Sequence, residues 1–193
     1  MLFRSTLQNV TTTGTQTYGE NATLNGTAYT TTNANFTAAG TTTLTNNATV
    51  STGTGNVTFT GAVDGAKDLV VNSTGTTLFS AAVGGTTGLS SLTTNAGGTV
   101  TLQNVTTTGV QSYGENATLN GTAYTTTNAN VSVGGTTTLT NNVTVSAGTG
   151  NVTFTGAVDG AKDLVVNSTG DTLFSGAVGG TTALTSLTTN AGG

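Results

Sequence analysis

The chain repeats itself, and this repeat limits its possible folds more than any other feature. Residues 6–98 and 101–193 align without a gap at an offset of 95 residues, and 81 of the 93 aligned positions are identical. The sequence therefore divides into a short non-repeat start at 1–5, a first repeat at 6–100 and a second repeat at 101–193. Because it stops at a repeat boundary, we expect it to be a slice of a longer array.

A shorter period of 20 residues lies inside each repeat, where segment 57–69 resembles segment 76–89. Apolar and polar residues alternate there over short stretches separated by Gly and Asn, which is typical of short β-strands joined by tight turns. We expect like residues of successive units to stack into a core ladder. The ladder residues are Phe59 and Phe79, Val63 and Val83, and Leu69 and Leu89, with Phe154, Phe174, Val158 and Val178 in the second repeat.

The composition favours strands and turns throughout. The chain has 53 threonines and 29 glycines, and Lys, Arg, Asp and Glu together make up only 5% of it. Threonine, valine and aromatic residues favour strands, while glycine and asparagine favour turns. Low charge combined with a regular supply of Val, Leu, Phe and Ala argues against disorder. The composition therefore predicts an all-β fold.

A unit of about 20 residues is too short for a propeller blade and fits one coil of a β-solenoid. Stacked coils supply each other's hydrogen-bond partners and apolar cover. The absence of proline fits this design, because proline would remove a donor from the ladder between coils. We predict an all-β parallel β-helix of about ten coils, each of roughly 19–23 residues, that continues through both repeats. An antiparallel sandwich is the alternative, since Asn-Gly and Asp-Gly also mark hairpins.

The chain offers few groups for chemistry. It has no His and no Cys, which excludes Ser-His-Asp and Cys-His catalysis and thiolate metal sites. The remaining candidates are Asp64, Lys67 and Asp68, repeated at 159–163, since glycoside hydrolysis uses paired carboxylates. Because these charges lie in a Gly-containing turn that occurs twice, we interpret them as solvated turn residues, with a weak cation site as the alternative. We expect no catalytic, cofactor-binding or metal site, and no enzyme activity.

Charge and hydropathy also limit the partners. A net charge of −4 with three basic residues gives no electrostatic footprint for nucleic acid. No apolar run is long enough to span a bilayer, and residues 1–5 lack the features of a signal peptide. We therefore expect no nucleic-acid partner and no membrane insertion, and an export signal that lies outside this sequence.

Two further residue sets are candidate surface sites. The tyrosines are candidates for a sugar-stacking surface, although packing at coil edges is the more ordinary expectation; they are Tyr18, Tyr29, Tyr113 and Tyr124. Asn-x-Ser/Thr sequons are candidate glycosylation sites; in the first repeat they include Asn9, Asn21, Asn47, Asn56 and Asn72.

The strings NVTTTGxQxYGENATLNG and LTTNAGGTVTLQNVTTTG resemble the repeats of large bacterial surface proteins of the filamentous-haemagglutinin type, and the resemblance extends from Thr6 to Gly193. That family is exported by two-partner or autotransporter-like routes. The resemblance implies a right-handed parallel β-helix, an extracellular location on the bacterial cell surface, and a parent protein that attaches to host-cell or surface glycans and proteins. It thus favours a structural and adhesive shaft segment.

Two other functions and one assembly mode stay open. An ice-binding solenoid needs a flat face of outward threonines in every coil, and threonine runs at 41–45 and 27–32 supply candidates. A carbohydrate-active β-helix enzyme is the third function, with Asp64 and Asp159 as its acids. Uncapped strand edges at the two ends favour end-to-end self-association.

Overall fold

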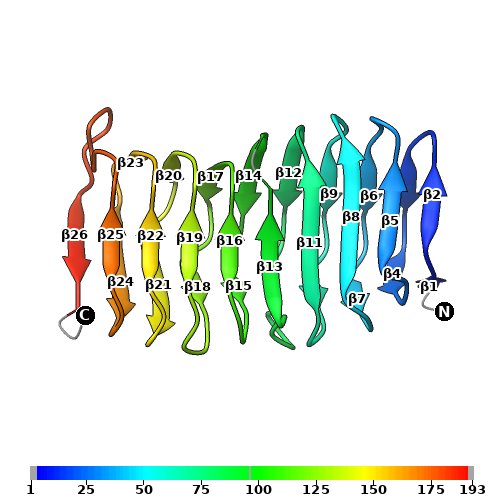
Figure 1. Cartoon of the computed structure of the whole chain (residues 1–193), viewed down its shortest axis with the longest axis horizontal. Coiled ribbons are helices and arrows are strands. Elements are labelled where there is room, and N and C mark those ends of the chain that lie inside the picture. The colour runs from blue at the N-terminus through cyan, green and yellow to red at the C-terminus, as the bar shows by residue number, and fades with distance from the viewer. Residues whose placement is uncertain (1–3, 96, 191–193) are drawn as a thin grey trace.

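The computed structural model describes residues 4–95 and 97–190, which form a parallel β-solenoid (Figure 1). Its longest sheet has nine strands, one from each of nine turns, close to the predicted ten. No helix occurs in the described residues, and the strand pairs run parallel. The predicted all-β parallel solenoid is therefore confirmed, and the antiparallel sandwich is excluded.

Each turn contributes a segment to each of three faces, and this segment is a strand except at the single-residue bridges Val83 and Val178. Face 1 holds β1 (Arg4–Leu7), β4 (Asn21–Leu24), β7 (Thr42–Leu44), β10 (Val63–Asp64), a bridge at Val83, β15 (Val105–Thr106), β18 (Ala123–Thr125), β21 (Val143–Gly148), β24 (Asp163–Ser168) and β26 (Ser186–Thr189). Face 2 holds β2 (Val10–Thr12), β5 (Ala28–Thr31), β8 (Ala48–Gly53), β11 (Asp68–Ser73), β13 (Ser91–Thr94), β16 (Gln111–Tyr113), β19 (Val131–Val133), β22 (Val152–Phe154) and β25 (Thr172–Phe174). Face 3 holds β3 (Gln16–Tyr18), β6 (Phe36–Ala38), β9 (Val57–Phe59), β12 (Thr76–Phe79), β14 (Thr99–Leu102), β17 (Asn116–Leu119), β20 (Thr137–Leu139) and β23 (Val158–Asp159).

The strands are short because the chain must turn a corner after each one. Alternate side chains point inward, so β9 buries Val57 and Phe59 and leaves Thr58 outside. A face of one turn is too narrow to cover this core alone, and the next turn completes the cover. Neighbouring turns pair at offsets that range from 17 residues, between Arg4 and Asn21, to 23, between Asp68 and Ser91.

The structure places the ladder residues in the interior, with one change of partner. Phe79 pairs with Phe59, and Val83 bridges to Val63. The second repeat has the same arrangement: Phe154 pairs with Phe174 and Val158 bridges to Val178.

The expected stacking of Leu69 on Leu89 is wrong, because Leu69 pairs with Leu92 in the next turn. The chain between Val83 and β13 forms a longer loop that lengthens this turn. Leu89 bridges instead to Thr107, although both leucines are fully buried.

The two repeats use the same sequence on different faces. The segment Val-Thr-Phe is β9 on face 3 in the first repeat and β22 on face 2 in the second. Likewise β11 lies on face 2, whereas its equivalent β24 lies on face 1. The first repeat contains thirteen strands and the bridge at Val83, which together are fourteen segments. Because each turn has three segments, one repeat makes four and two-thirds turns. Each repeat is therefore rotated by one face relative to the last.

Asparagines at the corners tie successive turns together. The Oδ1 atom of Asn35 accepts the N–H of Asn56 at 2.9 Å, and Oδ1 of Asn56 accepts the N–H of Thr76 at 2.9 Å. Asn33 has φ 54°, and its Oδ1 accepts the N–H of Thr54 at 3.1 Å. Asparagine tolerates this left-handed conformation better than other residues with a side chain. These side chains satisfy backbone donors where the sheets are interrupted.

Candidate functional site

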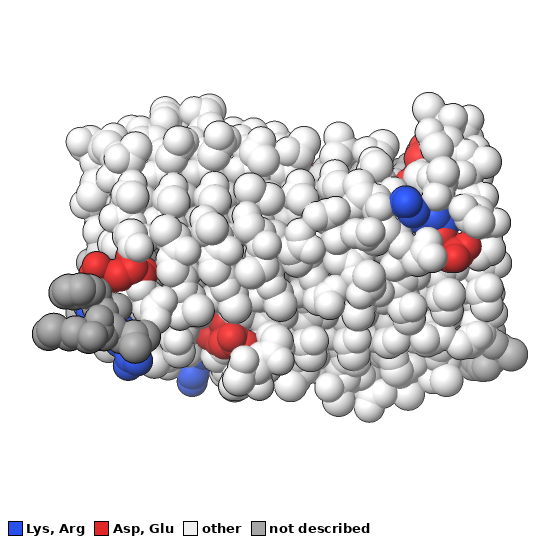
Figure 2. Space-filling view, turned by 180° about the vertical axis from the view of Figure 1, so that it is seen from behind, with Lys and Arg blue, Asp and Glu red and all other residues white. Residues whose placement is uncertain are grey.

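The charged turn is the feature with the greatest chemical content, and it occurs once per repeat. In the first copy Oδ1 of Asp64 accepts the N–H groups of Thr86 and Thr87 at 2.8 and 3.0 Å. The hydroxyl of Ser91 donates to Oδ1 of Asp68 at 2.7 Å. Asp64 therefore holds the loop of the following turn in place, and Asp68 bonds to the first residue of β13. Figure 2 shows the charged side chains confined to a few separate spots on a largely uncharged surface.

The second copy has the same contacts. Oδ1 of Asp159 accepts the N–H groups of Thr181 and Thr182 at 2.8 and 2.9 Å. These N–H donors, first that of Thr182 and then that of Thr181, lower the pKa of the Asp159 carboxyl. A glycosidase acid needs a raised pKa to stay protonated at neutral pH. The pKa of Asp159 is shifted in the opposite direction.

Other features bear on metals and membranes. Within residues 4–95 and 97–190, no three His, Cys, Asp or Glu residues come together in a group that could hold a metal ion. The same residues contain no helix long and apolar enough to cross a membrane.

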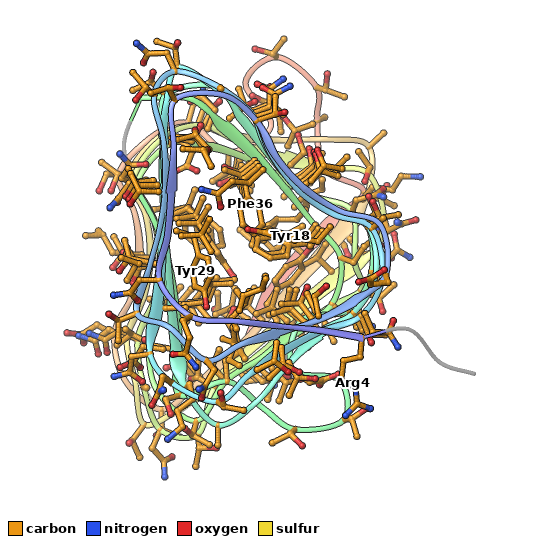
Figure 3. The ribbon with its side chains drawn as sticks, turned by 90° about the vertical axis from the view of Figure 1, so that its right-hand side faces the viewer. Arg4, Tyr18, Tyr29 and Phe36 are labelled. Carbon is orange, nitrogen blue, oxygen red and sulfur yellow. The ribbon has the colours of Figure 1, made fainter. Side chains whose placement is uncertain are left out.

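The tyrosines lie in the interior, so they do not form a sugar-stacking surface. Tyr29, Tyr113 and Tyr124 are at most 1% exposed, and Tyr18 is half-buried at the N-terminal end. Figure 3 shows Tyr18 and Tyr29 pointing into the coil beside Phe36. The hydroxyl of Tyr124 donates to the carbonyl of Leu102 at 3.0 Å, and burial raises the pKa of that hydroxyl above its ordinary value.

A buried glutamine hydrogen-bonds to one of these tyrosines and to the next turn. The Gln111 amide donates to the carbonyl of Thr125 at 2.9 Å, and its Oε1 accepts the hydroxyl of Tyr113 at 3.1 Å. Gln16 makes the matching bonds to Thr30 and Tyr18 in the first repeat. The tyrosines and glutamines thus act in folding, where they join adjacent turns.

Glu115 is the one buried acid among the described residues, and nothing in its local sequence pattern indicates that burial. It is 5% exposed, and its Oε2 atom has no hydrogen-bond partner. Burial raises the pKa of its carboxyl. Its equivalent Glu20 is exposed in the first turn and accepts the hydroxyl of Ser5 at 2.5 Å. A complete described turn precedes Glu115, and the Thr94 side chain of that turn lies beside its carboxyl.

Outward threonines form a file along face 3. Successive turns pair them in register, so their side chains lie about 4.8 Å apart along the axis. In chain order the file is Thr17, Thr37, Thr58, Leu78, Thr101, Thr118, Thr138 and Asp159. The sequence did not reveal this file, because it combines different strands of the two repeats.

All five candidate glycosylation asparagines form a side-chain hydrogen bond with a neighbouring turn. The Oδ1 atoms of Asn9, Asn21 and Asn47 accept the N–H groups of Thr27, Thr41 and Asp68 respectively. Asn56 makes the bond to Thr76 described above, and Asn72 donates to Ser51 at 3.5 Å. These side chains have a structural role whether or not they are modified.

A hollow of about 690 Å³ lies at the C-terminal end of the coil. Thr172, Phe174 and Leu187 line it, together with neighbouring residues of the last turn. It is the open mouth of the solenoid, since no further turn covers these side chains among the described residues.

No family model, curated protein or solved structure matches the chain. The function therefore has to be argued from its own geometry.

Proposed function

We propose that the chain is a structural and adhesive shaft segment of a large fibre on a bacterial cell surface. The continuous stacking at the repeat boundary carries this proposal. β12 of the first repeat pairs with β14 of the second, and Val83 bridges to Val105. Repeats therefore join without a separate domain interface, so adding repeats lengthens the rod.

The outer surface supports the same proposal. It is coated with hydroxyl and amide side chains and carries only ten charges in the whole sequence. Such a surface suits an extracellular rod that has to stay extended. The resemblance to filamentous-haemagglutinin-type repeats adds the expectation that the parent protein attaches to glycans or proteins of host cells or other surfaces.

Rod length tests the shaft. Chains of two, three and four repeats are compared by small-angle X-ray scattering. Each added repeat should lengthen the particle by about 22 Å, because it adds four and two-thirds turns at about 4.8 Å each. Compact particles that grow equally in all dimensions would contradict a shaft.

Binding and labelling experiments test the adhesive role and the cell-surface location. Beads coated with the chain should adhere to epithelial cells, and beads coated with serum albumin are the control. Antibodies against the chain should label intact bacteria that produce the parent protein. Beads that bind no better than the control would remove the adhesive role, and unlabelled intact cells would remove the surface location.

The threonine file favours ice binding as a second candidate. Six of its eight positions are threonine, and they repeat at regular axial intervals on face 3. A measurement of thermal hysteresis decides this candidate. Activity that Thr118→Tyr abolishes and Ser132→Tyr on face 2 leaves intact would support it, and no activity in the wild-type chain would exclude it.

A further inference from the structure

The two ends of the described solenoid are open in complementary ways. At the N-terminal end β1, β2 and β3 each have one unpaired edge, and at the C-terminal end β25 and β26 do. Apolar side chains that are fully covered elsewhere are only partly buried here. They are Leu7, Val10 and Tyr18 at the first end, and Phe174, Val178 and Leu184 at the second.

The equivalents of these six residues meet inside the chain. Where the first repeat joins the second, β12 pairs with β14, Val83 bridges to Val105, and β13 pairs with β16. At that junction all six equivalents are at most 1% exposed; they are Leu102, Val105 and Tyr113 on one side and Phe79, Val83 and Leu89 on the other. The internal junction thus shows how the two ends fit.

The two ends differ from the internal junction by a pair of opposite charges. At the internal junction Thr76 pairs with Thr99, and their hydroxyls lie 3.5 Å apart on the outer surface. The residue equivalent to Thr76 at the C-terminal end is Asp171, and the residue equivalent to Thr99 at the N-terminal end is Arg4. Both are exposed, and Figure 3 shows Arg4 on the outside of the first turn.

We propose that the C-terminal end of one copy binds the N-terminal end of a second copy in the register of the internal junction, with Arg4 of one copy beside Asp171 of the other. β1 then pairs with β25, β3 with β26, and Val10 with Val178. The hollow at the C-terminal end receives the apolar side chains of β1 and β2. The inward difference from the internal junction is Ser5, which replaces Val100 and meets Thr172.

This assembly does not depend on the adhesin proposal, because it requires only that the two described ends are free of further repeats. It also differs from unspecific pairing of strand edges, since it predicts one direction and one register. Two experiments test those two properties.

Cross-linking tests the register directly, because the chain has no cysteine of its own. Paired residues on adjacent parallel strands have Cα atoms about 4.8 Å apart, within the range of a disulfide. Oxidation of the Arg4→Cys, Asp171→Cys double variant should give a ladder of disulfide-linked multimers. A mixture of the two single variants should stop at dimers. The Arg4→Cys, Leu173→Cys variant, displaced by two residues along the strand, is the matched control and should cross-link much less.

Charge exchange tests the same contact without a covalent bond. Arg4→Asp and Asp171→Arg should each raise the Kd of self-association about fivefold to tenfold at low salt. An equimolar mixture of the two variants should assemble again, because each end then meets an opposite charge. Circular dichroism confirms that each variant is folded.

Analytical ultracentrifugation of the wild-type chain shows whether it self-associates. A monomer at every concentration would overturn the proposal. Multimers that neither cross-link through residues 4 and 171 nor respond to charge exchange would overturn the register.

Discussion

The rings of Phe59 and Phe79 lie parallel, with centroids 5.2 Å apart and planes 4° apart. Phe154 and Phe174 repeat this stack at 5.3 Å and 7°, but Phe174 belongs to the last turn and is only partly buried. The same pair of residues thus occurs once inside the solenoid and once at its end. This arrangement separates the effect of stacking from that of burial.

Phe79→Ala should lower the free energy of unfolding by about 3–5 kcal/mol, because it opens a cavity in a covered core. Phe174→Ala should cost roughly half as much, because part of that ring is already in water. Urea denaturation at a concentration where the chain is monomeric measures both. Equal costs would show that the end of the solenoid is covered in solution.

Stability should fall with rising pH through the raised pKa of Glu115. Its carboxyl has an ordinary pKa of 4.5, and burial raises that value in the folded chain. Between the two values the folded chain binds more protons than the unfolded one. Its stabilising effect is complete below pH 4.5 and is lost as the pH rises through the folded-state pKa.

Glu115→Gln should therefore raise the melting temperature at pH 7 and flatten its dependence on pH. Glu20→Gln is the matched control, since Glu20 is exposed, and its melting temperature at pH 7 should stay close to that of the wild type. Thermal melting from pH 4 to pH 8 gives the comparison. An unchanged slope in Glu115→Gln would contradict the assignment.

The hydrogen bonds of Asp159 to Thr181 and Thr182 should give stability a pH dependence of the opposite sign. The pKa of the Asp159 carboxyl is lowered in the folded chain. Its contribution to stability is therefore complete at pH values above its ordinary pKa and is lost as the pH falls through the folded-state pKa. Asp159→Asn should speed amide hydrogen exchange at Thr181 and Thr182, and Lys162→Gln in the same turn should not. Exchange that is as slow in Asp159→Asn as in the wild type would show that the loop is held by other contacts.

Asn56 should matter for stability although it is exposed. Asn56→Ala removes the acceptor of the Thr76 N–H, and the loss of such a bond costs about 1 kcal/mol. Thr54→Ala, an exposed substitution two residues away, should stay within about 0.5 kcal/mol of the wild type. Chemical denaturation distinguishes the two.

The fold could be predicted because neighbouring turns share residues that stack. Phe59 and Phe79 have the spacing of one turn, and so do Val63 and Val83. The spacing misled for Leu69, because the loop before β13 changes the length of one turn without changing the apolar pattern. A local pattern shows the average period, whereas the actual partner depends on every intervening loop.

The candidate site was harder to predict. The pattern at Asp64 identified a turn, but its acceptor role depends on the loop of another turn. Glu115 is buried whereas its counterpart Glu20 is exposed, and of the two only Glu115 has a complete described turn before it. Both properties belong to contacts between turns, which no single repeat contains.

The rotation of each repeat by one face means that no single segment of the repeat stays on one face of a long array. A given side chain would point in three directions in turn and would return to the first only after three repeats of 95 residues. A partner that recognises one patch would approach successive copies from different sides, so bound partners would not crowd one another. Each strand must also pack correctly wherever the winding places it, which restricts how far a single copy can diverge.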